Sequence, residues 1–410
     1  MRSNYKRIGD FIKRVEKRNT DLKVTKLLGL SMTKEFRETT SNIVGTDMKV
    51  YRVMRKYQFA CDFMSPIRVN KLPVVLKLDD EPNLVSPAYP VFEVKDRNLL
   101  DPEYLMMWFR RSEFDRYATF KCDGAIRGGY DWTAFCDTLL PIPTIAKQKE
   151  IVKEYNVIQN RIELNKQLIQ KLEETAQAIY KQWFVDFEFP DENGKPYKSN
   201  GGEMIESELG KIPKGWEATL LGKISEIKTG PFGSALLNEQ YIIGGTPIIT
   251  VEHIKDFRIA KLDYPSVTDE DKKRLSSYLL KEGDIVFSRV GSVDLSALVQ
   301  KNNSGWLFSS RMLRLRPNKN QVDSTILSYF LRLRKTRDLI IRLSVGSTMP
   351  SINTNILKNI PFCNCPYSIN KSMGLSLSKF NDRTINYQKQ NDTLEKFSQL
   401  ILSKLAIIEN

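Results

Sequence analysis

Two stretches of this chain place apolar residues at alternating steps of four and three positions. The first runs from about 151 to 183, and its seam positions are Ile151, Tyr155, Ile158, Ile162, Asn165, Ile169, Leu172, Ala176, Ile179 and Trp183. This spacing is typical of the heptad seam of a long helix. At about 1.5 Å per residue the helix is roughly 50 Å long, far longer than a globular core requires.

The same seam recurs 222 positions later, at Met373, Leu377, Phe380, Thr384, Tyr387, Asn391, Leu394, Ser398, Ile401 and Leu405. Because both helices carry one apolar stripe in the same register, we expect them to pack together. Two amphipathic helices on separate domain cores are the alternative, but the repetition favours the pair. Some seam positions are polar, and these residues either fix the register or mark where a partner docks: Asn165, Thr384, Asn391 and Ser398.

The spacing of 222 also relates the segments that precede the two helices. Residues 101–105 match residues 323–327, since both segments begin with Asp and end with Leu. Near the start, Ile8-Gly-Asp matches Leu221-Gly-Lys at a slightly shorter spacing. Agreement on nearly one offset indicates the duplication of a body followed by a long helix.

Each body has the pattern of a mixed α/β domain of about 150 residues. Short strands are predicted, for example at 286–288 and 312–316, and one helix is expected at about 102–117 and again at about 323–343. The expected organisation is a first domain over 1–144, a central long helix over 145–189, a turn-rich linker over 190–215, a second domain over 216–365 and a C-terminal long helix over 366–410.

The positive charge of the chain is divided between the two bodies. Of 63 basic and 49 acidic residues, residues 1–150 hold 27 and 20, residues 206–362 hold 23 and 16, and the remainder holds 13 of each. The excess is therefore shared by the bodies and absent from the segments that join them. This distribution implies two equivalent bodies that bind a polyanion.

Composition favours a cytoplasmic protein. The first residues are charged where a secretory signal needs an apolar stretch, and no apolar run is long enough to span a membrane. The five cysteines are thinly spread, as expected for reduced thiols in a reducing compartment.

Catalytic chemistry is scarce. The single histidine, His253, is expected to be structural, and the chain has no phosphate loop and no S-adenosylmethionine motif. Two acidic groupings contain the residue types of an Mg²⁺-dependent nuclease site: Asp79 or Asp80 with Glu93-Val-Lys95, and the segment 190–195. The first does not recur in the second body, and the second lies in the linker. We expect that the chain itself catalyses no reaction.

Several strings are similar to those of a known family. The most specific lie at the central junction, Ala178-Ile-Tyr-Lys-Gln-Trp-Phe-Val-Asp-Phe187 and residues 203–216, and others lie at 282–291, 139–143 and 359–361. With the duplicated body and long helix, they make the chain resemble the specificity subunits of Type I restriction-modification enzymes over essentially its whole length.

The resemblance implies an α+β fold with two similar target recognition domains in tandem repeat, each followed by a long helix, the two helices forming an antiparallel coiled coil. Each domain would read one half of a bipartite, asymmetric double-stranded DNA target, and the helices would set the gap. The implied partners are two methyltransferase (M) subunits and restriction/translocase (R) subunits, which would carry out adenine methylation and restriction. S-adenosylmethionine, ATP and Mg²⁺ would bind to those partners, and this chain would hold no cofactor and no metal.

The best candidates for DNA contact lie in the loop that precedes the last strand of each body. They are Lys121, Gly124, Arg127, Gly128 and Tyr130 in the first body, and Ser347 and Thr348 in the second. Glycines let the backbone approach phosphates, and arginine forms two hydrogen bonds to a guanine edge. A glycine turn with a solvated arginine is the alternative. Weaker candidates are Ser288, Arg289, Ser310 and Arg311.

An apolar cluster ends the central helix at Trp183, Phe184 and Phe187. It fits either an interface for a methyltransferase subunit or the closure of a domain core. Two other functions remain open for the whole chain: a coiled-coil scaffold whose bodies bind acidic proteins, and a metal-dependent nuclease. Salt-dependent binding of duplex DNA would separate the first from a specificity subunit, and Mg²⁺-dependent cutting would identify the second.

Overall fold

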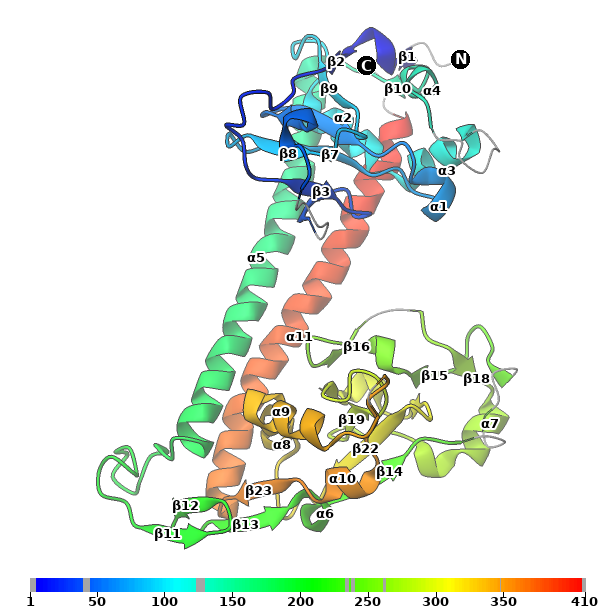
Figure 1. Ribbon diagram of the computed structural model, residues 1–410. Helices are drawn as coiled ribbons and strands as arrows, with labels where there is room; N and C mark the ends of the chain where they lie inside the picture. The colour runs from blue at the N-terminus through cyan, green and yellow to red at the C-terminus, as the bar shows by residue number, and fades with distance from the viewer. Residues whose placement is uncertain are drawn as a thin grey trace. The chain divides into compact units, whose positions relative to one another are not determined.

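The chain folds into two units that share its two long helices (Figure 1). The computed structural model describes residues 5–39, 45–122, 130–232, 236, 240–260, 263–346 and 348–407. The first unit consists of Met1–Lys166 and Gln388–Asn410, and the second of Gln167–Tyr387. Each unit thus holds one α/β body, part of α5 (Ile145–Phe184) and part of α11 (Tyr367–Lys404).

The first body is built on a four-stranded antiparallel sheet in the order β2-β9-β6-β7. Three further antiparallel pairs are β1 with β10, β3 with β4 and β5 with β8. The strands are β1 (Tyr5–Arg7), β2 (Ile12–Val15), β3 (Leu28–Leu30), β4 (Phe36–Glu38), β5 (Arg52–Met54), β6 (Gln58–Cys61), β7 (Val74–Leu76), β8 (Asn83–Val85), β9 (Val91–Val94) and β10 (Leu139–Pro141). The helices are α1 (Pro66–Val69), α2 (Pro102–Phe109), α3 (Ser112–Lys121) and α4 (Trp132–Cys136).

The second body has the corresponding sheet, β14-β22-β19-β20, and the corresponding pair, β13 with β23. It adds a three-stranded sheet, β18-β15-β21, and the hairpins β11–β12 and β16–β17. The strands are β11 (Met204–Ser207), β12 (Gly210–Pro213), β13 (Glu217–Leu220), β14 (Ser225–Thr229), β15 (Thr246–Ile249), β16 (Ile254–Lys255), β17 (Arg258–Ile259), β18 (Ser266–Val267), β19 (Ile285–Ser288), β20 (Ser296–Leu298), β21 (Leu307–Phe308), β22 (Met312–Pro317) and β23 (Pro361–Asn364). The helices are α6 (Leu221–Ile224), α7 (Asp269–Arg274), α8 (Ser324–Arg332), α9 (Arg334–Leu343) and α10 (Thr354–Lys358). Part of the expected linker over 190–215 is therefore the β11–β12 hairpin.

The shared topology of the two bodies confirms the tandem repeat. One hydrogen bond recurs at the spacing of 222: the side chain of Gln148 accepts from the Asp101 amide at 2.8 Å, and that of Asn370 accepts from the Asp323 amide at 2.7 Å. Asp101 and Asp323 are also the N-caps of α2 and α8. In each body this bond ties the start of the long helix to the start of α2 or α8.

Close packing explains the glycine that Ile8-Gly-Asp and Leu221-Gly-Lys share. A Cβ atom on Gly9 would lie 2.7 Å from the Cβ of Cys136, and one on Gly222 would lie 2.8 Å from the Cβ of Lys358. Cys136 and Lys358 end α4 and α10, which also correspond at a spacing of 222. A larger residue at either glycine would push these segments apart.

The predicted segments are helical, but each is divided into two helices, so the expectation of one unbroken helix was wrong. Arg111, with a ψ angle of 137°, separates α2 from α3, and Leu333, with 133°, separates α8 from α9. In an unbroken helix Phe109 and Phe114 would point about 140° apart. The interruption brings their rings to 5.0 Å within one core. Packing ends these helices, with no proline or glycine at the break to reveal it in the sequence.

The long helices contribute to the core of each unit. In the first unit the aromatic core of the body includes Ile151 and Tyr155 of α5 and Leu402 of α11. In the second unit the core includes Ala176, Tyr180 and Phe184 of α5 and Met373 and Leu377 of α11. Each body is therefore held on both helices by apolar packing.

Together α5 and α11 form an antiparallel coiled coil (Figure 1). None of the predicted seam residues in either helix is exposed. In the first unit Gln159 donates to Ser398 at 2.9 Å and Asn165 donates to Asn391 at 2.8 Å, so the numbering falls along one helix as it rises along the other. Asn165, Asn391 and Ser398 are buried, which supports their role in fixing the register.

Candidate nucleic-acid interface

Three candidate segments of the second body, far apart in the sequence, meet at one place. The backbone amide of Arg289 donates to the carbonyl of Arg311, and the carbonyl of Arg289 accepts from the amide of Ile352, both at 2.9 Å. The amide of Gly291 donates to the carbonyl of Pro350 at 2.8 Å. The turn after β19, the turn before β22 and the 346–351 loop are therefore adjacent. We call this place the loop surface of the second body, and its exposed or half-buried candidates are Arg289, Ser310, Arg311 and Thr348.

Backbone pairing shapes the 346–351 loop. The amide of Val345 donates to the carbonyl of Ser351 at 2.9 Å, and the reverse bond is 2.8 Å long. Gly346 has a φ angle of +103°, and a Cβ atom there would lie 2.8 Å from the carbonyl oxygen of Met349. The glycine is thus required by the turn, which leaves Thr348 exposed at its tip. Ser347 lies outside the described residues.

Arg289 is held in place from two sides. Its Nη1 donates to the carbonyl oxygen of Ser310 at 3.0 Å, and its guanidinium lies 4.6 Å from the ring centre of Phe232. A cation over an aromatic face is attracted by the ring quadrupole. Phe232 is 51% exposed, and the sequence analysis did not select it as a candidate. The feature that could have indicated it is an aromatic residue within a glycine- and proline-rich segment, Gly230-Pro-Phe-Gly.

Ser288 does not belong to this surface. Its side chain is fully buried in β19, and its hydroxyl donates to the carbonyl of Val290 at 3.3 Å. Alternation along the strand explains the difference from Arg289, because successive side chains point to opposite faces. The structure therefore corrects the expectation for Ser288.

Tyr130 of the first body is also buried, which corrects its assignment as a DNA contact. Its side chain is 1% exposed, and its hydroxyl lies 3.2 Å from that of Thr138. Burial raises the pKa of the hydroxyl well above its usual value. The amide of Tyr130 donates to the carbonyl of Phe63, and the amide of Ile352 donates to the carbonyl of Arg289 in the same way. Tyr130 therefore takes the core position of Ile352 in the repeat.

The other candidates in the loop of the first body, Gly124, Arg127 and Gly128, lie outside the described residues. Lys121, the last residue of α3, is exposed, and its ammonium lies 5.8 Å from the ring centre of Tyr117. Lys121 remains the described cation nearest to this loop in the sequence.

The aromatic cluster at the end of α5 packs into the second body. The ring of Phe184 lies 5.3 Å from that of Trp216, and the ring of Phe187 lies 5.6 Å from it at 86°. Phe184 is buried, whereas Trp183 and Phe187 are partly buried against the same core. Of the two interpretations left open, closure of the domain core accounts for these contacts. This corrects the assignment of Phe184 as part of a partner interface.

The residues singled out for catalytic chemistry have structural contacts. His253 is buried, and its Nδ1 accepts from the Thr250 amide at 2.9 Å. Asp79 pairs with Lys77, Asp80 with Lys56, and Glu93 with Lys13. Within the described ranges no three His, Cys, Asp or Glu side chains gather as metal ligands would. No described helix has the length and apolar character to cross a membrane.

Comparison with known proteins shows where the sequence is similar to others. The family model for the Type I restriction modification DNA specificity domain matches residues 213–396. The chain is 31% identical over 207 residues to the putative type I restriction enzyme MjaX specificity subunit of Methanocaldococcus jannaschii, covering 48% of this chain and 47% of that protein. It is 26% identical over 315 residues to the MjaIX specificity subunit of the same organism, covering 75% and 68%. The match thus spans about half of the first relative.

The fold is similar to the crystal structure of the S subunit of a type I restriction-modification system from M. genitalium. The TM-score is 0.56 at 13% identity, over 99% of this chain and 96% of that one. At this identity the likeness concerns the fold alone, and it extends over both bodies and both long helices. Residues 213–396 thus match the DNA specificity domain of type I restriction-modification systems, and the chain is similar in sequence to type I restriction enzyme specificity subunits.

Proposed function

We propose that this chain binds DNA and provides the sequence specificity of a type I restriction-modification complex. Its target is a bipartite, asymmetric duplex sequence, and each body contacts one half of it. The observation that carries the proposal is the loop surface of the second body, where Arg289, Arg311 and Thr348 arrive from three separate segments. Arginine and hydroxyl side chains are the groups that recognise base edges and phosphates.

The charge distribution supports the same function. Each body carries an excess of basic residues, and the remaining segments are balanced. In the first body Lys121 is the described candidate, and the sequence adds Gly124, Arg127 and Gly128. A basic body attracts duplex DNA because neutralised phosphates release their counterions, and the binding therefore weakens with salt.

The partners we propose are two methyltransferase subunits and restriction/translocase subunits in the cytoplasm. They methylate adenines and restrict DNA at sites that this chain selects. S-adenosylmethionine, ATP and Mg²⁺ belong to those subunits in this proposal, and the chain itself catalyses nothing. The similarity to type I specificity subunits supports this division of labour, together with the absence of nucleotide-binding motifs from the sequence.

The test is the methylome of the host with and without this gene. We expect one bipartite motif to lose adenine methylation when the gene is deleted, and the chain assembled with its methyltransferase subunits to bind that duplex in a salt-dependent manner. An unchanged methylome with no duplex binding would favour the acidic-protein scaffold. Mg²⁺-dependent cutting of DNA by the purified chain would favour the nuclease.

A further inference from the structure

A protected cluster of one carboxylate and two guanidinium groups joins the second body to α5. Glu173 of α5 accepts from Nη2 of Arg258 in β17 at 2.7 Å, and its other carboxylate oxygen accepts from Arg332, the last residue of α8. The side chains of Arg332, Arg258 and Glu173 are 5%, 17% and 27% exposed. Salt screens such a sheltered pair much less than a surface pair. We call these three residues the Glu173 cluster.

The β16–β17 hairpin, which carries Arg258, has a turn adapted to this contact. Its central residues, Asp256 and Phe257, both have positive φ angles, 48° and 59°. Residues other than glycine rarely adopt this backbone conformation unless their surroundings favour it. Here the Phe257 ring lies 5.5 Å from the guanidinium of Arg332 and 5.3 Å from that of Arg337. The hairpin tip therefore packs directly against the cluster.

The hairpin is also continuous with the loop surface. It follows β15 through a short turn in which the Thr250 amide donates to His253. β15 pairs with β21, and β21 leads directly to Ser310 and Arg311. Glu173 thus holds, through Arg258, the part of the second body that presents these two residues.

Among the residues of the first body that the structure describes, no such cluster occurs. The repeat places Glu395 at the position of Glu173 and Arg110 at the position of Arg332. Glu395 is exposed, and it forms no ion pair with any other described residue. Arg110 instead donates to the hydroxyl of Tyr155 at 3.3 Å.

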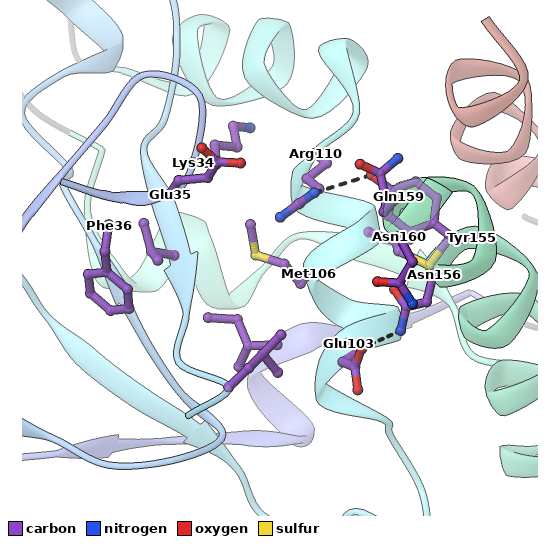
Figure 2. Close-up of a pocket in the computed structure, with 14 residues that line it drawn as sticks. Lys34, Glu35, Phe36, Glu103, Met106, Arg110, Tyr155, Asn156, Gln159 and Asn160 are labelled. Carbon is purple, nitrogen blue, oxygen red and sulfur yellow. Dashed lines mark hydrogen bonds between the residues drawn. The ribbon is translucent and has the colours of Figure 1, made fainter. Parts of the chain in front are cut away.

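A pocket of about 370 Å³ opens beside Arg110 (Figure 2). Lys34, Glu35 and Phe36, at the end of the β3–β4 hairpin, line one side of it, and residues of α5 that include Tyr155 and Gln159 line the other. The β3–β4 hairpin of the first body is thus separated from α5 by a pocket, whereas the β16–β17 hairpin of the second body is bonded to α5 through Arg258.

We infer that Glu173 is a positioning residue for DNA recognition, which fixes the loop surface of the second body on α5. The inference rests on the proposed function and on the long helices setting the gap between half-sites, as the resemblance to specificity subunits implies. A body held firmly on its helix reads its half-site at one gap length. A body that shifts on the helix accepts several gap lengths, although its own base contacts are unchanged.

The test uses the chain assembled with its methyltransferase subunits. Glu173→Gln removes the carboxylate charge and leaves two sheltered guanidinium groups facing each other. We expect methylation of targets whose gap is one base pair longer or shorter, with selectivity for gap length reduced about tenfold and base preference in both half-sites kept. Glu395→Gln is the matched control, since Glu395 forms no ion pair with another described residue, and it should leave gap selectivity unchanged.

A second variant separates positioning from stability. Glu173→Gln combined with Arg258→Gln removes one uncompensated cation, so the melting temperature should recover. The bond to α5 remains absent, so gap selectivity should stay relaxed. Recovery of strict gap selectivity along with stability, or a strict gap in Glu173→Gln itself, would show that Glu173 only stabilises the fold. If the unmodified complex methylates no bipartite target, the proposed function fails instead.

Discussion

Arg289 and Phe63 occupy corresponding places in the two bodies. The carbonyl of Arg289 accepts from the amide of Ile352, and the carbonyl of Phe63 accepts from the amide of Tyr130, both at 2.9 Å. Ile352 and Tyr130 correspond at the spacing of 222. The two side chains differ, because Arg289 reaches the loop surface beside Phe232, whereas the ring of Phe63 packs 5.7 Å from that of Tyr130. One backbone arrangement therefore presents different chemistry in each body. This agrees with the proposal that the two bodies read different half-sites.

The substitution Arg289→Ala tests whether the loop surface contacts DNA. If Arg289 contacts a guanine edge, its loss should cost about 1–3 kcal/mol of binding and relax one position of the second half-site only. The measurement is binding of the assembled methyltransferase to a panel of single-base variants at fixed salt. Arg334→Ala is the control, since this arginine is 92% exposed on α9 and pairs only loosely with Asp338.

Other outcomes for Arg289→Ala have distinct meanings. Equal weakening for all sequences, with a shallower salt dependence, would identify a phosphate contact instead. Unchanged affinity and base preference would remove Arg289 from the reading surface.

Among the elements, the coiled coil contains polar residues at positions where apolar ones would be more stabilising. Asn165 donates to Asn391 at 2.8 Å, and the side chain of Asn391 also reaches the carbonyl of Ile162 at 3.5 Å. These bonds can form only when the two helices are aligned in this register. A polar pair inside an apolar seam thus reduces stability and excludes shifted alignments.

Asn165→Leu should destabilise the chain by about 1–3 kcal/mol, because it leaves the buried amide of Asn391 without its partner. Replacing both residues with leucine should recover this loss, so the two substitutions should be strongly non-additive in thermal unfolding of the full chain. Val157→Ala, at an exposed position of α5, serves as the control. Additive effects of the two substitutions would mean that the pair does not act as a unit.

For the whole molecule, we expect the long helices to act as a spacer between the two half-sites of the proposed target. Four residues inserted after Gln170 lengthen a helix by about 6 Å, which is close to two base-pair steps of about 3.4 Å. The insertion also turns the following segment by roughly 40°, because four residues slightly exceed one turn of about 3.6. We expect both half-sites to be kept and the gap to grow by one or two base pairs.

Sequencing of the methylated sites measures this change directly. A four-residue insertion between Asn193 and Gly194, in the turn after α5, is the control, because it adds no helix. Unaltered spacing with full activity after the Gln170 insertion would contradict the role of the helices as a spacer.

The sequence predicted most of the architecture because the signals for it are local or repeated. The seam from Ile151 to Trp183 recurs at a spacing of 222, and a helical stripe depends only on periodicity along the chain. The glycines at 9 and 222 were visible as a repeated motif, although only the structure shows the side chains that they accommodate. The predictions of single helices at 102–117 and 323–343 were only partly right, because core packing interrupts each helix.

The sequence by itself thus determined the two bodies, the two long helices and the polar seam positions. Tertiary structure alone decided which candidates meet, because the contacts at Arg289 and those between Glu173, Arg258 and Arg332 join residues that no periodicity relates. It also decided that Tyr130 and Ser288 are buried. The physical reason is that the exposure of a loop or strand-end side chain depends on what packs over it, and that neighbour comes from a distant part of the chain.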